Sequence, residues 1–158
     1  MGDRPTPPPE ETARWRRHFA VECNNRAWQL AEQVERSVGE NEEMVHAAHA
    51  AALLWEGIGD ETHRARGWLL LGHALGLAGH GAEGLGYARR SLEFFLAREC
   101  PDWEIAFAHL AVASAARAAG EAALFQTERA EAARLGEAIA DPEDREIFLA
   151  SLRALPAA

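Results

Sequence analysis

Histidines are the side chains of this sequence best suited to metal binding or acid–base chemistry, and the chain has seven of them. His46 and His49 stand three residues apart, so on a helix they share one face. Together with His73 they would supply the three protein ligands of a metal site. No His-Glu-x-x-His signature accompanies them, so we expect no metal and no other cofactor. A small metal- or ligand-binding helical protein that uses His46, His49 and His73 is kept as an alternative.

The candidate nucleophiles lack the sequence contexts that activate them. Ser91, Ser114 and Ser151 are not part of a Gly-x-Ser-x-Gly elbow. Cys23 and Cys100 belong to no Cys-x-x-Cys pair, so we interpret them as free thiols in a reducing compartment. All 16 basic residues are arginines, which excludes Schiff-base chemistry and a P-loop lysine. We therefore expect no enzyme.

Charge and hydropathy narrow the classes of partner and the location. The net charge of −9 argues against a general nucleic-acid binder. No apolar run approaches the ~20 residues that a membrane-spanning helix needs, and the N-terminus has no signal-peptide core. Arginine without lysine is typical of a GC-rich genome. We expect a bacterial, cytoplasmic protein.

The distribution of proline predicts the domain organisation. Residues 1–9 hold four prolines and little apolar mass, so we expect a flexible arm followed by one helical domain over 10–158. The first helix is expected to start at residues 10–12 and to end before Gly39. Phe19 and Val34 are among its apolar positions. Its weakest stretch is Asn24-Asn25, where we expect a kink or break because asparagine competes for backbone hydrogen bonds.

Capping residues predict the remaining helix boundaries. Asn41 is expected to cap a helix that runs to about residue 56, and Asp60 to cap the next. Gly79-His80-Gly81 is expected to form the following turn. Further helices are predicted at 103–119 and 121–140, and Asp141-Pro142 signals the start of a last, amphipathic helix.

One stretch resembles a known helical repeat. Trp68-x2-Leu71-Gly72-x2-Leu75 resembles the first helix of a tetratricopeptide repeat (TPR), which has the pattern W-x2-L-G-x2-Y. The resemblance implies an all-α, right-handed stack of antiparallel helical hairpins. Gly39, Gly79 and Gly120 each stand where a first helix would end, at separations of 40 and 41. We therefore predict three hairpins and a C-terminal capping helix.

Four glycines fall inside the two helices of the central hairpin. Gly72 and Gly76 lie four residues apart on one face of the first helix, and Gly84 and Gly86 lie in the second. Each glycine costs about 1 kcal/mol relative to alanine within a helix, so it needs a reason. No strand precedes them, which excludes a nucleotide-binding glycine loop. We interpret all four as sites of close helix packing.

The resemblance also implies a binding surface. In TPR proteins the first helix of each pair lines a concave groove that holds an extended peptide. We therefore expect a module that binds a partner protein or peptide, including an acidic one, because four arginines would give the groove a positive field. The alternative is a structural homodimer that pairs its terminal helices. The expected groove residues are Arg26, Gln29, Gln33, Arg36, Arg66, Leu69, His73, Phe107, Leu110, Ser114 and Arg117.

Overall fold

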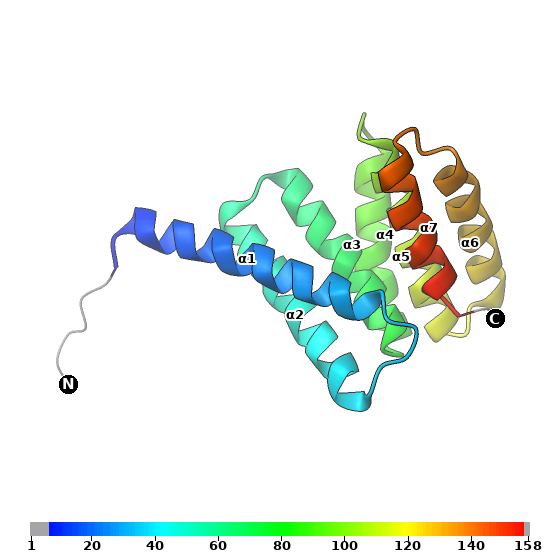
Figure 1. The fold of residues 1–158 in the computed structure, drawn as a ribbon, viewed down its shortest axis with the longest axis horizontal. Coiled ribbons are helices and arrows are strands. Elements are labelled where there is room, and N and C mark those ends of the chain that lie inside the picture. The colour runs from blue at the N-terminus through cyan, green and yellow to red at the C-terminus, as the bar shows by residue number, and fades with distance from the viewer. Residues whose placement is uncertain (1–6, 157–158) are drawn as a thin grey trace.

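The computed structural model describes residues 7–156, and these residues form seven α-helices and no strand (Figure 1). The prediction of an all-α fold is confirmed. The predicted arm, residues 1–9, lies mostly outside the described residues, and Pro9 already belongs to the first helix. The helices are α1 (Pro9–Ala31), α2 (Val38–Ile58), α3 (Glu61–Leu77), α4 (Gly81–Leu96), α5 (Asp102–Ala118), α6 (Ala122–Glu137) and α7 (Pro142–Ala154).

The first helix differs from its prediction. α1 starts with Pro9 at its first position and has Glu10 and Glu11 in its first turn, a favourable arrangement at the positive end of a helix dipole. It passes through Asn24-Asn25 as one continuous helix, so the expected break there is wrong. It ends at Ala31, well before the predicted boundary at Gly39.

A capping box explains the shifted start of α2. The Ser37 hydroxyl accepts a hydrogen bond from the Glu40 backbone N–H, and the Glu40 carboxylate accepts one from the Ser37 N–H at 2.8 Å. Two otherwise unpaired donors are satisfied in this way. Gly39 therefore lies inside α2 and does not terminate α1, and Asn41 is not the cap.

The later helices start and end where their capping residues and turn glycines predict. Asp60 caps α3 through the His63 N–H, and Asp141 caps α7 through the N–H groups of Glu143 and Asp144. Gly79 and Gly120 have φ angles of +90° and +75°, and they form the turns after α3 and α5. A left-handed backbone favours glycine because a Cβ atom would be strained there. The predictions at Asp60, Gly79, Gly120 and Asp141 are confirmed.

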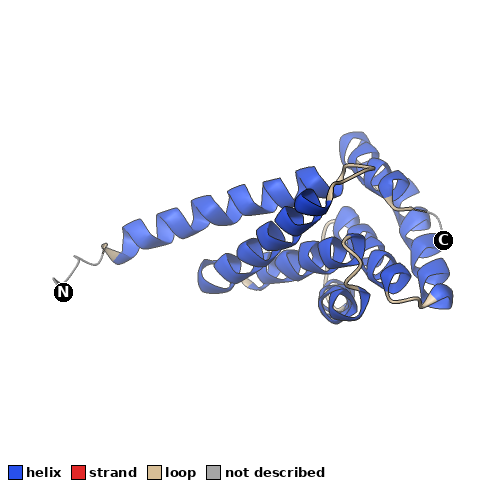
Figure 2. Ribbon diagram, turned by 90° about the horizontal axis from the view of Figure 1, so that it is seen from below, coloured by secondary structure: helices blue, strands red, loops and turns tan. Residues whose placement is uncertain are grey.

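Neighbouring helices pack against one another along the chain (Figures 1 and 2). α1 packs on α2, α3 on α4, and α5 on α6, while α3 and α4 both contact α5 in the centre. α7 lies against α5 and α6 and buries Phe148, Leu152 and Leu155. The first two helices thus begin the series of packed helices along the chain, and α7 ends it.

Small residues let α3, α4 and α5 approach closely. A Cβ atom at Gly72 would lie 2.7 Å from the Ala88 nitrogen, and one at Gly76 would lie 2.6 Å from the Ala115 nitrogen. Gly84 lies in turn against the backbone of Gly72. The packing interpretation is right for these three glycines. It is wrong for Gly86, where a Cβ atom would meet nothing within 4 Å.

The N-terminal half of α1 projects from the body of the molecule (Figures 1 and 2). From Pro9 to Phe19 every residue except the half-buried Thr12 is exposed, and the first buried residue of α1 is Ala20. Phe19 is 52% exposed and Val34, which lies beyond the end of α1, is 79% exposed. Both were predicted as apolar positions of the first helix. Phe19 lies on α1 but is largely uncovered, and the assignment of Val34 to the first helix is wrong, because α1 ends at Ala31.

Candidate functional site

The hydrogen bond between His73 and Ser114 does not make a nucleophilic pair. His73 on α3 and Ser114 on α5 are buried, and His73 Nδ1 lies 2.7 Å from Ser114 Oγ. The Ser114 hydroxyl donates its own proton to the Leu110 carbonyl at 2.9 Å. His73 Nδ1 is therefore the donor and Ser114 Oγ the acceptor. This polarity is opposite to the one that would activate the serine.

Burial keeps His73 uncharged. Desolvation, assisted by the nearby Arg36 guanidinium, lowers the pKa of His73 from 6.5 to about 4. A neutral imidazole suits a structural hydrogen bond between two helices. Both Ser114 and His73 were expected on a partner-binding groove, and both lie inside the molecule.

The three histidines of the metal alternative do not come together. His46 and His49 are exposed on α2, whereas His73 is buried against α5. Over residues 7–156 no group of three or more His, Cys, Asp or Glu side chains is placed to hold a metal ion. His109 is half-buried, and its Nδ1 lies 2.6 Å from a carboxylate oxygen of Glu128.

Two of the predicted groove arginines have partners within the first two helices. Arg26 makes two hydrogen bonds to the Glu43 carboxylate, from Nε at 2.6 Å and from Nη2 at 2.9 Å, and a third to Gln29. The bond to Glu43 raises the pKa of Arg26. Arg36 donates to the Gln33 carbonyl at 2.6 Å and to Asn41 at 2.9 Å. These contacts tie the loop after α1 to α2.

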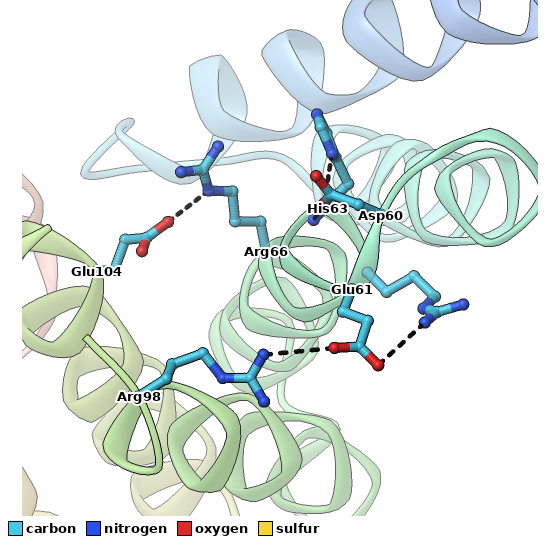
Figure 3. A network of polar contacts seen from close by, with 7 residues as sticks. Asp60, Glu61, His63, Arg66, Arg98 and Glu104 are labelled. Carbon is cyan, nitrogen blue, oxygen red and sulfur yellow. Dashed lines mark hydrogen bonds and ion pairs between the residues drawn. The ribbon is translucent and has the colours of Figure 1, made fainter. Parts of the chain in front are cut away.

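The third groove arginine stabilises a buried carboxylate (Figure 3). Arg66 Nε on α3 donates to Glu104 on α5 at 2.5 Å, and its guanidinium lies over the Trp103 ring. Glu104 is 1% exposed. A buried carboxylate needs such a partner, because an uncompensated charge in the interior is costly. The ion pair therefore fixes α3 to α5.

A surface network lies beside that ion pair (Figure 3). Glu61 lies between two arginines, with Arg98 at 3.5 Å and Arg64 at 3.9 Å. Asp60 accepts hydrogen bonds from the backbone and the ring of His63. These contacts link the start of α3 to the end of α4. They are exposed, so each contributes little to stability.

Aromatic side chains fill the inner face that the first helices of the pairs share. Trp28 of α1 lies 5.7 Å from His73 and 5.3 Å from Phe107, between ring centroids. Phe107 in turn packs edge-on against Phe148 of α7, at 4.9 Å. Leu69 and Leu110 are buried in the same core. The chain's own side chains thus occupy the place where a groove was expected.

The last groove residue lies elsewhere on the surface. Arg117 is exposed near the end of α5 and lines a shallow cleft of about 350 Å³ with Gly120, Ala122 and Phe125. The predicted site residues are therefore spread over the inner core, the first loop and the turn after α5. The structure does not bring the four arginines together into one positively charged surface.

An exposed aromatic cluster on α1 is the feature that the sequence analysis missed. Trp15 stacks on Phe19 with ring centroids 6.0 Å apart, and the His18 ring lies edge-on to both. Trp15 is 46% exposed. We call residues 14–19, Arg-Trp-Arg-Arg-His-Phe, the aromatic tip. A signal was present: six consecutive residues contain three arginines, three rings and no acid.

The cysteines do not add a reactive site. Cys23 and Cys100 are free and half-buried. Burial raises the pKa of both thiols, and a neighbouring carboxylate, Glu22 or Glu104, raises it further. A raised pKa leaves less thiolate, which is the nucleophilic form.

No protein-family model, curated protein or solved structure matches the chain. The TPR resemblance therefore has only the residues Trp68 to Leu75 as its support. Among the helices of residues 7–156, none combines the length and the apolar character needed to cross a bilayer.

Proposed function

We propose that this chain is a protein-interaction module without catalytic activity, built as a right-handed, TPR-like stack, and that its docking element is the aromatic tip of α1. The expected concave groove is not retained in this proposal. Its polar residues are bonded within the molecule or buried, and Trp28, Phe107 and Phe148 fill its place.

The observation that carries the proposal is the exposure of Trp15 and Phe19 on a helix segment that has no buried residue and touches the end of α2 through Arg16 and Arg17. An isolated helix of this length is only marginally stable in water, so these residues depend on their continuity with the packed half of α1. Aromatic side chains bring large buried areas to interfaces, and tryptophan and arginine are enriched at binding hot spots. Two large rings presented in this way favour an interface.

A reducing, cytoplasmic location is compatible with this module and belongs to the same proposal. Cys23 and Cys100 are unpaired, and the chain has no other cysteine that could form a disulfide with either. A reducing compartment preserves such thiols.

Site-specific photo-crosslinking in cells tests the docking element. A photoreactive phenylalanine analogue is placed at Phe19, and a matched control carries it at Ile147, which is 49% exposed on α7. We expect a defined crosslinked product from position 19 and none from position 147. Equal products from both positions, or none from position 19, would contradict a docking role for the tip.

A further inference from the structure

Two segments of the first helix pair carry opposite formal charges. The aromatic tip holds Arg14, Arg16 and Arg17 and has a formal charge of +3. We call residues 32–43, which include the loop after α1 and the first turns of α2, the acidic end. Five glutamates and Arg36 give the acidic end a formal charge of −4.

Helix α1 holds these two regions apart. The acidic end starts where α1 stops, at Ala31, and the tip lies near the other end of the same helix (Figure 1). At about 1.5 Å per residue, Trp15 and Glu32 are separated by roughly 26 Å along the axis. The tip cannot reach its own acidic end, because a continuous helix lies between them.

Both regions also expose apolar side chains. Trp15 and Phe19 lie on the tip, and Val34, which is more exposed than either ring, lies in the acidic end beside Glu35. The two regions are therefore complementary in two ways: the tip carries arginines and exposed rings, and the acidic end carries glutamates and an exposed valine.

We propose that the tip's partner is a second copy of this chain, with the two α1 helices antiparallel across a two-fold axis. This inference rests on the proposed function, since it names the occupant of the same docking element. A two-fold axis near the middle of α1 places Arg14 and Trp15 of each copy against Glu35 and Val34 of the other. Such an interface is isologous, so every contact occurs twice and the assembly closes as a dimer.

The second copy explains both regions with one partner. An unrelated acidic protein would cover the tip and leave Val34 exposed beside Glu35. In the two-fold arrangement each aromatic tip covers an acidic end, and the projecting half of α1 lies against the end of α1 and the following loop of the other copy. Like charges oppose one another in the parallel arrangement, which disfavours that register.

Sedimentation equilibrium of the full chain, combined with charge reversal, tests the proposal. Arg14→Glu and Glu35→Arg each place like charges in opposition twice per dimer, so each is expected to raise the dimer Kd at least tenfold. The double variant Arg14→Glu/Glu35→Arg restores both pairs and is expected to return the Kd to within threefold of wild type. Glu99→Arg, an exposed charge reversal in the loop after α4, is the matched control and should leave the Kd unchanged.

Ring removal supplies a second, uncharged test. Phe19→Ala is expected to weaken the dimer at least tenfold, whereas Ile147→Ala, at similar exposure, is expected to have no effect. Circular dichroism of every variant checks that the helices are intact. Added salt should weaken the wild-type dimer, because exposed charge pairs are screened.

The outcomes separate the dimer from the docking element. A chain that is monomeric at all concentrations, or a dimer insensitive to Arg14, Phe19 and Glu35, overturns the second-copy proposal. If the crosslinker at position 19 then captures a different protein, the docking element stands and its occupant is that protein. A monomer that also gives no crosslink at position 19 contradicts both.

Discussion

The first and the last helix of the chain differ in how far other helices cover them. α7 is a short amphipathic helix that buries Phe148, Leu152 and Leu155 against α5 and α6. The first half of α1 carries Trp15 and Phe19 with nothing packed over them. Both segments have large apolar side chains at helical spacing. What differs is how far each segment is covered. α5 and α6 bury the apolar face of α7, whereas α1 has buried residues only from Ala20 onwards and meets α2 before that point through Arg17, whose guanidinium lies over the Trp55 ring.

The largest effect on stability is expected in α7, the helix whose apolar face is covered. Phe148→Ala should lower the free energy of unfolding by about 3–5 kcal/mol, because it removes a buried ring and leaves a cavity beside Phe107. Its neighbour Ile147→Ala should change stability by less than ~0.5 kcal/mol. Urea unfolding of both variants measures the difference. Similar costs for the two positions would mean that α7 is not the covered end.

The packed centre predicts a dependence of stability on pH. His73 has a pKa of about 4 in the folded chain and near 6.5 when unfolded, so the unfolded state takes up a proton first as the pH falls. The stabilisation is complete above pH 6.5 and is lost between about pH 6.5 and 4, by roughly 3 kcal/mol in total. Between pH 7 and pH 5 the free energy of unfolding of the wild type should fall by about 2 kcal/mol, and that of His73→Gln by less. An equal loss in both proteins would show that another group is responsible.

The sequence could reveal features that depend on residues close together along the chain. Asp60, Gly79, Gly120 and Asp141 act on their own neighbours along the chain, so the boundaries of the later helices were predictable. Glu104 was not, because its partner Arg66 lies 38 residues away and only packing brings α3 beside α5.

The first two helices show the limits of local signals. Both Ser37 and Asn41 are good capping residues, and the choice between them depended on the reciprocal bond from Glu40. The periodicity that places Phe19 on an apolar face is the same whether or not another helix covers that face. The sequence therefore predicted an apolar position and could not predict its exposure.

A third, smaller effect on stability is expected where α3 and α4 pack closely. Gly72→Ala should destabilise the chain by about 1–3 kcal/mol, because the new methyl group meets the backbone of Ala88. Gly86→Ala, on the partner helix, meets open space and should stabilise by up to ~1 kcal/mol through helix propensity. Thermal unfolding of the pair gives opposite signs if the packing is as described. Two changes of the same sign would contradict it.

The smallest effect on folding is expected at the projecting end. Phe19→Ala, measured at a dilution where the chain is monomeric, should change the free energy of unfolding by less than ~0.5 kcal/mol, since its ring contacts little beyond the tip. A cost comparable to that of Phe148→Ala would mean that the tip folds back on its own chain. The contrast between no effect on the monomer and a large effect on the dimer is what distinguishes an interface from a core.

The continuity of α1 has a kinetic consequence. One unbroken helix joins a half with no buried residue to a half anchored by Ala20, Ala27 and Leu30, so its backbone amides need not open together. In the monomer, amide hydrogens before Phe19 are expected to exchange with deuterium rapidly, at a rate set by fraying of the helix end. Those beyond Ala20 are expected to exchange more slowly. A second copy lying along α1 would slow exchange most in the first group, so the exchange profile of this helix would report the fraction of chains that are in the dimer.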